Sequence, residues 1–459
     1  MENGNGQSAA LPYDRRDRQS IYHYAINLRG STLRERSNVD SIDDIRRNKG
    51  SFGSAVETHY FMLDLNSDSA PDFKEAGLEL KTTPLKRNKD GSLSAKERLV
   101  LGMIDYMQVV SEEFETSHLM EKAEDILLIS YLWEPDTDPL DYRVELVEIV
   151  SLPGLPEGDL VQIKADWKTV VQKVRDGLAH EISGSDTLYL EACTKAANSK
   201  ARRKQPYSDI EAKPRAWALK ASFMTAMSNR IIEGMQSIER AEGERGMTLI
   251  QLVRHRFEPY FGLTEQELGE RFGYIKPGKR KPKNLCALIT RRILGVSDDA
   301  KIEEFEKAGI KPKTMRIKSN GTPKESVSFP RFDYFELVDT PFEDSDFASY
   351  LDQKYLFVIY REDDSERGLY RLSDVAFWQM PDDDLDEAER CYEEMRSRVA
   401  NGRAQDSVKS SENRCCHVRP HGRDNTDTLP TPQGDMVVKK CFWLNAQYLK
   451  GEILKITEI

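Results

Sequence analysis

Residues 72–82 read DFKEAGLELKT, and this stretch decides the fold expected for the N-terminal half of the chain. In its second half, apolar and charged side chains alternate, which is the period of a half-buried strand. Glu79 and Lys81 therefore share one face of that strand. Gly77 favours a turn just before it, so we expect a chain reversal that brings the carboxylate of Asp72 beside Glu79.

Two carboxylates and a lysine at one point suit the hydrolysis of a phosphodiester. The reaction needs a hard divalent cation, and Mg²⁺ prefers carboxylate oxygens such as those of Asp72 and Glu79. Lys81 is placed to hold the attacking water and help to deprotonate it. Residues 53–63 are predicted to form a short helix that carries Glu57 among apolar neighbours, where a carboxylate needs a partner or a metal. The alternative is that these residues have no catalytic role, because charged residues on the solvent-exposed face of a strand often produce this pattern by chance.

The bulk composition indicates a globular protein with more than one domain. A chain of 459 residues is too long for one ordinary core, and two domains are the simplest expectation. The hydrophobic fraction of 39% and charged fraction of 32% are typical of soluble proteins, and no apolar run is long enough to cross a bilayer. Residues 1–14 lack the features of a secretory signal, so we expect a polar tail and a cytoplasmic location. The six cysteines lack metal-binding spacing and are expected to be reduced thiols.

Charge is distributed unevenly along the chain. The net charge of −11 argues against a protein that coats nucleic acids nonspecifically, but it leaves room for a local basic cleft. Basic residues gather between Cys193 and Lys220, and again from Arg271 to Lys283, where no acidic residue occurs. Such runs are often only solvated faces, so by themselves they support DNA binding weakly.

Four motifs occur in a fixed order around the predicted site. They are Lys49-Gly50-x-x-Gly53-x-x-x-Glu57, residues 72–82, Phe114-Glu115-Thr116-Ser117-His118 followed by Lys122, and the segment from Tyr189-Leu190 to Lys195-Ala196-Ala197-Asn198-Ser199-Lys200-Ala201. Together they resemble the MutH mismatch-repair nicking enzymes and the related type II restriction endonucleases that cut at GATC. The resemblance covers roughly residues 20–230. It implies an α/β restriction-endonuclease-like fold, the PD-(D/E)xK fold, in which helices flank a mixed sheet.

The same resemblance implies roles for individual residues. The carboxylates that would bind Mg²⁺ are Glu57, Asp72 and Glu79, and the lysines that would serve the chemistry are Lys81 and Lys122. Lys195 would read a base in the major groove, whereas other contacts would position the duplex. The residues expected to contact DNA are Lys49, Lys195, Asn198, Lys200, Arg202, Arg215 and Lys220.

Two positions depart from the pattern of the mismatch-repair enzymes. Ala218 stands where those enzymes have a tyrosine that senses adenine methylation. Cys193 stands where an arginine is expected just before the reading lysine. These differences argue against the sensing of hemimethylated DNA and favour a restriction enzyme.

A second stretch, residues 304–314, reads EFEKAGIKPKT and repeats the frame of residues 72–82. The counterparts of Glu57, Asp72, Glu79 and Lys81 are Ile289, Glu304, Lys311 and Lys313, respectively. A lysine repels a cation and an isoleucine offers no oxygen, so this second site is not expected to bind Mg²⁺. Weaker likeness continues at residues 354–359 and 441–444, although a chance similarity of two αβ segments is the alternative.

The repeat predicts a tandem organisation with one working site. We expect a catalytic domain over residues 15–232, a polar helical linker over 233–247 and a degenerate DNA-binding, allosteric copy over 248–459. Residues 401–434 are rich in Ser, Asn, Pro and Gly and are expected to form a mobile loop.

The leading hypothesis is a type II restriction endonuclease that hydrolyses both strands of double-stranded DNA at GATC with Mg²⁺. Its second domain would bind an effector site, and two chains would meet on each cleaved site, because each chain offers one active site. One alternative is a methyl-directed mismatch-repair nicking enzyme. The other is a non-catalytic, sequence-specific DNA-binding protein, against which the intact set of carboxylates and Lys81 argues.

Overall fold

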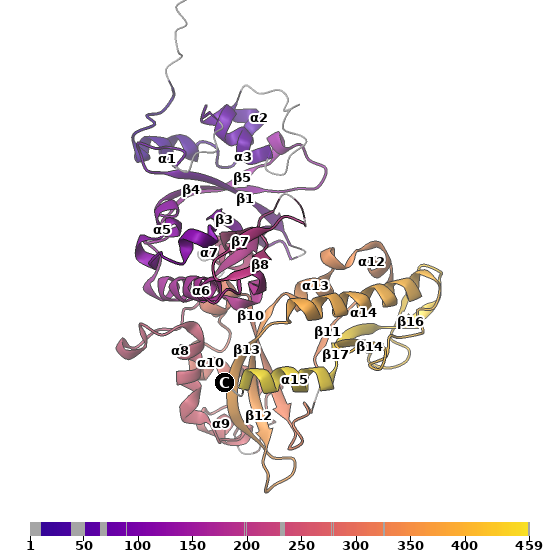
Figure 1. The fold of residues 1–459 in the computed structure, drawn as a ribbon. Coiled ribbons are helices and arrows are strands. Elements are labelled where there is room, and N and C mark those ends of the chain that lie inside the picture. Colours follow the sequence, from indigo (N-terminus) through magenta and orange to yellow (C-terminus); the bar gives the residue numbers. More distant parts are fainter. Residues whose placement is uncertain are drawn as a thin grey trace, which may run out of the picture. The chain divides into compact units, whose positions relative to one another are not determined.

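The structure is a computed structural model that describes residues 11–37, 51–64, 71–88, 90–196, 198, 200–229, 235–276, 278, 280–324 and 326–457. The chain divides into two compact units, Met1–Glu233 and Gly234–Ile459 (Figure 1). The division falls at the start of the predicted linker, and each unit is described by itself.

The first unit contains helices on both sides of a mixed sheet (Figure 1). Its elements are α1 (Arg18–Ile26), α2 (Leu33–Arg36), α3 (Ser51–Ala55), the π-helix η1 (Val56–Tyr60), β1 (Glu79–Arg87), β2 (Leu93–Ala95), β3 (Leu99–Met103), α4 (Tyr106–Val109), η2 (Phe114–Thr116), α5 (His118–Lys122), β4 (Ile126–Leu132), η3 (Pro139–Asp141), β5 (Val144–Val150), α6 (Glu157–Arg175), η4 (Ala179–Glu181), η5 (Gly184–Asp186), β6 (Leu190–Thr194), β7 (Arg203–Gln205), β8 (Ser208–Ala212), β9 (Arg215–Leu219) and α7 (Ala221–Asn229).

The main sheet of the first unit has the order β2-β1-β4-β5. β1 and β4 are parallel, and the other two pairings are antiparallel, so the expected mixed sheet is confirmed. The apolar run of β4 lies in the middle of this sheet, where both faces are covered. Helices α1, α2 and α3 cover one face (Figure 1), and Phe52, Leu80 and Ile129 meet in the core beneath them.

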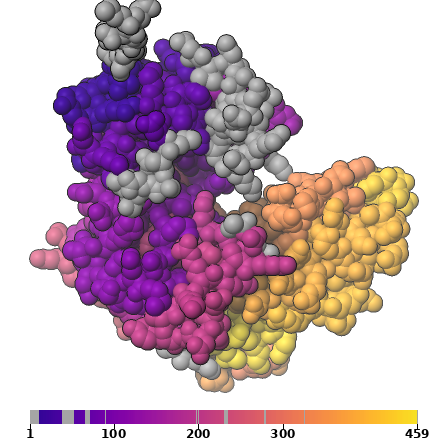
Figure 2. All heavy atoms as spheres, turned by 45° about the horizontal axis from the view of Figure 1, so that its top comes forward, coloured from indigo at the N-terminus to yellow at the C-terminus, as the bar shows by residue number. Residues whose placement is uncertain are grey.

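A second, antiparallel sheet of the order β3-β9-β6 carries the predicted DNA-reading segment. Between β6 and β9 the chain forms the β7–β8 hairpin. In the space-filling view, the magenta segment around this hairpin lies at the surface of the first unit (Figure 2).

Helix α6 fixes the beginning of β6. Its apolar face is buried through Ile163, Trp167 and Val170. The same face carries Asp166, which accepts hydrogen bonds from the backbone N–H groups of residues 188, 189 and 190 at 3.0, 2.7 and 3.0 Å. A buried carboxylate is stabilised by such donors, so Asp166 ties the long helix to the beginning of β6.

The second unit contains two three-stranded sheets and a long helix, α14 (Figure 1). Its elements are η6 (Glu242–Glu244), α8 (Leu249–Phe257), η7 (Glu258–Tyr260), α9 (Glu265–Arg271), α10 (Leu285–Leu294), α11 (Glu303–Ala308), β10 (Ile310–Ile317), β11 (Ser328–Arg331), α12 (Tyr334–Asp339), η8 (Phe342–Asp344), α13 (Asp346–Leu351), β12 (Lys354–Glu362), β13 (Tyr370–Trp378), α14 (Asp382–Ala400), β14 (Cys416–Pro420), β15 (Thr428–Pro430), β16 (Met436–Val438), β17 (Lys440–Leu444) and α15 (Ala446–Thr457).

The strands of the second unit follow the same plan as those of the first. β10 is parallel to β12, and β12 is antiparallel to β13, as β1, β4 and β5 are. The order β11-β17-β14 corresponds to β3-β9-β6. The helix caps also agree, since Ser117 begins α5 and Ser345 begins α13 through the same side-chain bond.

Two sequence expectations about irregular segments are wrong. Residues 235–247 are not helical apart from η6, because Gln236 pairs with Ile302 in a short bridge and its backbone joins the second unit. The loop expected over residues 401–434 contains β14 and β15, because apolar residues such as Val418 are buried there. Composition alone did not reveal these long-range pairings.

All six cysteines are unpaired, as expected from their spacing. No helix in the described part of the chain combines the length and the apolar character required to span a bilayer.

Candidate active site

The reversal before β1 brings Asp72 to the strand. Phe73 and Leu78 pair across it, with Phe73 N donating to Leu78 O at 3.0 Å. Gly77 has a φ of +60°, a conformation that glycine adopts without strain. The N–H of Leu80 then donates to Asp72 Oδ2 at 2.8 Å. The predicted chain reversal is therefore confirmed, and it fixes the Asp72 carboxylate beside the first residues of β1.

Glu57 reaches the same place from the helical side. It lies in η1, the π-helical turn that continues α3, and such turns are common at functional sites. Burial raises the pKa of Glu57, Asp72 and Glu79 raise it further, and Lys81 lowers it. The three carboxylates are thus within electrostatic range of one another.

The pKa of Asp72 depends on burial and on the charged groups around it. Burial and the Glu79 carboxylate raise the pKa of Asp72, whereas the Leu80 N–H, Lys81 and Lys122 lower it. Lys81 Nζ donates to Glu79 Oε1 at 2.5 Å. The structure therefore places Asp72, Glu79 and Lys81 together at the start of β1. Glu57 and Lys122 influence this place through their charges, without a hydrogen bond to the other three among the described residues.

The donor set fits a divalent cation. Within the described residues, no three His, Cys, Asp or Glu side chains already converge as a finished metal site. However, Asp72 Oδ1 and Glu79 Oε2 have no hydrogen-bond partner among the described residues, so each carboxylate keeps an oxygen for an ion. Burial raises the pKa of Glu57 and of Asp72, and a cation between such carboxylates would stabilise their ionised forms.

Two glycines allow the elements to approach the site closely. A Cβ on Gly53 would lie 2.9 Å from Thr82 Oγ1, so α3 packs against β1 at a distance that only glycine permits. A Cβ on Gly102 of β3 would lie 3.5 Å from Lys122 Cδ, so β3 passes next to this lysine at the end of α5. Gly53 belongs to the first motif, and its role there is close packing.

The residues predicted to contact DNA fall into two groups. Lys195, Asn198, Lys200 and Arg202 are exposed in the segment that follows β6. By contrast, Arg215 is 9% exposed and donates to the carbonyl oxygens of Ala192 and Ile182. Lys220 Nζ donates to the carbonyl oxygens of residues 184 and 187 at 2.7 and 2.9 Å.

These bonds give Arg215 and Lys220 a structural role, because their cationic groups satisfy buried carbonyls of the same unit. We therefore do not propose them as DNA contacts. Lys49 lies outside the described residues. The two departures from the mismatch-repair pattern, Cys193 and Ala218, are buried in a small apolar cluster with Ala216.

In the second unit, the residues that correspond to the predicted metal ligands of the first unit have different surroundings. Lys311 pairs in register with Tyr355, as Glu79 pairs with Ile126. Both carboxylate oxygens of Glu304 accept the N–H of Ile238, at 3.0 and 3.1 Å. Ile289 is buried in α10. The carboxylate retained at this site is thus bound to the segment before α8.

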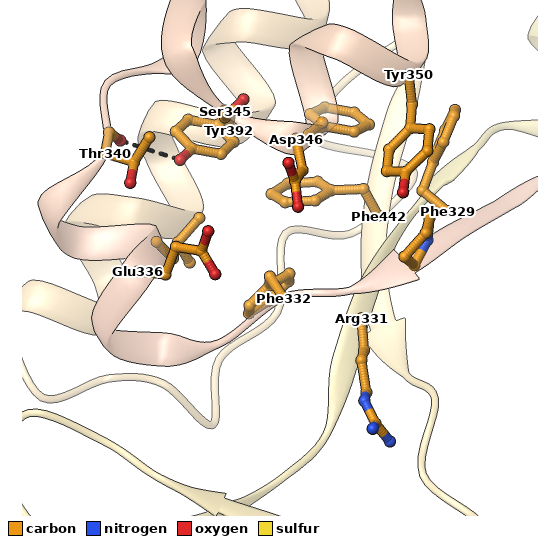
Figure 3. A pocket seen from close by; sticks show the side chains of 13 residues that line it. Phe329, Arg331, Phe332, Glu336, Thr340, Ser345, Asp346, Tyr350, Tyr392 and Phe442 are labelled. Atoms are coloured by element: carbon orange, nitrogen blue, oxygen red, sulfur yellow. Dashed lines mark hydrogen bonds between the residues drawn. The ribbon is translucent and has the colours of Figure 1, made fainter. Parts of the chain in front are cut away.

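Each unit also has a cavity at a corresponding place, which the motifs did not indicate. In the first unit it measures about 230 Å³ and is lined by residues of β3, α4, α5 and β9, including His118 and Trp217. In the second unit it measures about 60 Å³, between β11, α12, α13 and β17. There aromatic rings fill most of the space, and Tyr392 donates to Thr340 O at 3.0 Å (Figure 3).

Comparisons with known proteins found one matching family model and several similar proteins. The family model described as "DNA mismatch repair enzyme MutH" matches residues 61–166 and 295–389, one segment in each unit. The type II restriction enzyme Sau3AI of Staphylococcus aureus is 31% identical, over 95% of this chain and 98% of its own length. MutH of Vibrio vulnificus is 30% identical over 42% of this chain and 82% of its own. MutH of Actinobacillus pleuropneumoniae is 29% identical over 38% and 74%.

Proposed function

The chain belongs to the family of type II restriction enzymes and MutH nucleases, and we propose that it cuts double-stranded DNA at GATC with Mg²⁺. It is a site-specific DNA endonuclease. The observation that supports the proposal most is the placement of Asp72, Glu79 and Lys81 at the start of β1, with Glu57 and Lys122 within electrostatic range.

Glu57, Asp72 and Glu79 would hold the ion. When bound, Mg²⁺ supplies charge stabilisation at the phosphate and lowers the pKa of a coordinated water. Lys81, which donates to Glu79, would orient the attacking water and, in its neutral amine form, would accept a proton from it. Lys122 approaches from α5 and neutralises charge that develops on the phosphate.

Recognition is proposed to lie in the exposed segment after β6. Lys195 would read a base edge in the major groove, and Asn198, Lys200 and Arg202 would hold the backbone. Asp166 supports this segment from below by fixing residues 188–190. Ala218 and Cys193 replace the tyrosine and the arginine of the mismatch-repair pattern, and this difference favours restriction over the sensing of methylation.

The second unit is proposed to be a degenerate copy of the first that binds an effector site. Three observations support the duplication: the matching strand order, the register of β10 with β12, and the second segment that the family model matches. Its site has Lys311 and Ile289 where ligands would be needed, so it is not expected to cleave. Because each chain has one working site, two chains are proposed to meet on a cleaved palindrome.

Cleavage of supercoiled plasmid tests the proposal. With Mg²⁺ and a plasmid that contains unmethylated GATC sites, rapid formation of linear DNA is expected, and the sequenced ends should begin or end within GATC. Persistent nicked circles would instead support a nicking enzyme of the mismatch-repair type. Plasmids with one and two sites test the effector role, since the two-site plasmid should be cut faster per site.

A further inference from the structure

Strand β10 presents two lysines on the face that corresponds to the active-site face of β1. Lys311 and Lys313 are two residues apart, so they share a face, and they pair in register with Tyr355 and Phe357 of β12. In the first unit the corresponding positions are Glu79 and Lys81, opposite residues 126 and 128 of β4. The metal-ligand position has therefore gained a cation, while the neighbouring lysine position is unchanged.

The surroundings of these lysines leave their charge available. Lys311 is exposed, and its nearest carboxylate oxygen, Glu306 Oε1, lies 3.9 Å away, at the limit of an ion pair. Lys313 Nζ lies 6.0 Å from the ring centre of Phe329 and 5.6 Å from that of Tyr355. Among the residues that the structure describes, Lys313 forms no ion pair with a carboxylate. Glu304, which could have paired with these lysines, is bound to the N–H of Ile238.

The aromatic rings of Phe329 and Tyr355 lie next to the ammonium group of Lys313. Phe329 forms part of the wall of the aromatic cavity (Figure 3), and its ring and that of Tyr355 attract an ammonium group without neutralising it. Burial lowers the pKa of Lys313, and an approaching anion opposes that shift. A cation that lacks an acidic partner, beside an exposed second cation, makes a site for an anion.

We propose that Lys311 occupies the place of the divalent ion in the second unit and, with Lys313 behind it, binds a backbone phosphate of DNA without a metal. The inference rests on the proposed binding of DNA by this unit, and it names the group that binds. In the first unit, three carboxylates repel a phosphate until an ion is bound. In the second unit the ammonium group supplies the positive charge directly, but it cannot acidify a water as a metal does, so the phosphate is held and not cut.

The test measures binding of the full-length protein to a short GATC duplex in EDTA, by fluorescence anisotropy over a range of salt concentrations. Wild type is expected to bind, whereas Lys311→Ala should bind several-fold more weakly and lower the slope of log affinity against log salt by about 1. Lys311→Arg keeps the charge and should restore binding. Lys318→Ala removes an exposed lysine just beyond the same strand and should match wild type.

A second measurement uses the duplex as an effector. In Mg²⁺, cleavage of single-site DNA is followed while an uncleavable phosphorothioate duplex is added, and Lys311→Ala should need several-fold more duplex for half-maximal stimulation. Melting curves of each variant identify any loss through misfolding. Equal binding and equal stimulation of Lys311→Ala and wild type would overturn the inference, as would wild-type binding that disappears in EDTA. A duplex that fails to stimulate wild type would refute the effector function, while the EDTA experiment would still decide the role of Lys311.

Discussion

Replacing Gly53 by alanine should impair catalysis more than stability. The new Cβ would lie 2.9 Å from Thr82 Oγ1, about 0.5 Å inside the 3.4 Å at which ordinary contact begins. Thr82 is β-branched and stiff, so α3 has to move away from β1 by about that distance. Because Glu57 follows on η1, the shift separates it from Asp72 and Glu79.

The expected loss in kcat/KM follows from the size of this displacement. A misplacement of 1 Å at an active site can cost about 100-fold in rate, so about 0.5 Å should cost about tenfold in kcat/KM. The unfolding free energy should change less, because alanine favours a helix by about 1 kcal/mol while overpacking costs about 1–3 kcal/mol. More Mg²⁺ should be needed for half-maximal activity, since one ligand has moved.

The assay is cleavage of a single-site duplex over a range of Mg²⁺ concentrations, together with thermal unfolding. The matched control is Gly451→Ala, because Gly451 also lies in a helix but a Cβ there meets nothing within 4 Å. The double variant Gly53→Ala with Thr82→Ala restores space and should recover most of the activity. If Gly53→Ala kept the kcat/KM and the Mg²⁺ dependence of the wild type, the proposed constraint on the packing of α3 against β1 would be refuted.

The remaining predictions concern the carboxylates and the buried polar groups. Glu79→Ala should abolish Mg²⁺-dependent cleavage but leave DNA binding measurable by gel shift; retained cleavage would remove Glu79 from the ligand set. Because the pKa values of Glu57 and Asp72 are raised, activity should fall on acidification at a higher pH than for free carboxyl groups. Raising the Mg²⁺ concentration should move that midpoint to lower pH, because the ion binds only the ionised form; a midpoint independent of Mg²⁺ would contradict this. Asp166→Asn leaves backbone donors of β6 less well satisfied, so it should lower the unfolding free energy by about 1–3 kcal/mol and raise KM, and an unchanged melting temperature would argue against its positioning role. Arg215→Ala should destabilise the protein, whereas Lys195→Ala should weaken DNA binding at unchanged stability; the reverse pattern would restore Arg215 as a DNA contact.

The sequence by itself determined the parts of the site that lie close together along the chain. The alternation in residues 78–81 and the glycine before it specify a turn and a strand, so Asp72, Glu79 and Lys81 had to meet. The substitution at Lys311 was also visible, because a lysine in place of an acid changes the chemistry whatever surrounds it. These inferences depend only on backbone geometry and side-chain type.

Only the tertiary structure decided the roles of groups whose partners are distant in sequence. Arg215 and Lys220 belong to a basic segment, yet they donate to carbonyl oxygens of residues 182–192, and Glu304 accepts the N–H of a residue before α8. Sequence showed the charge of each group but not its burial. The physical reason is that a buried polar group must be satisfied by whichever element packs against it, and that packing is set by the whole fold.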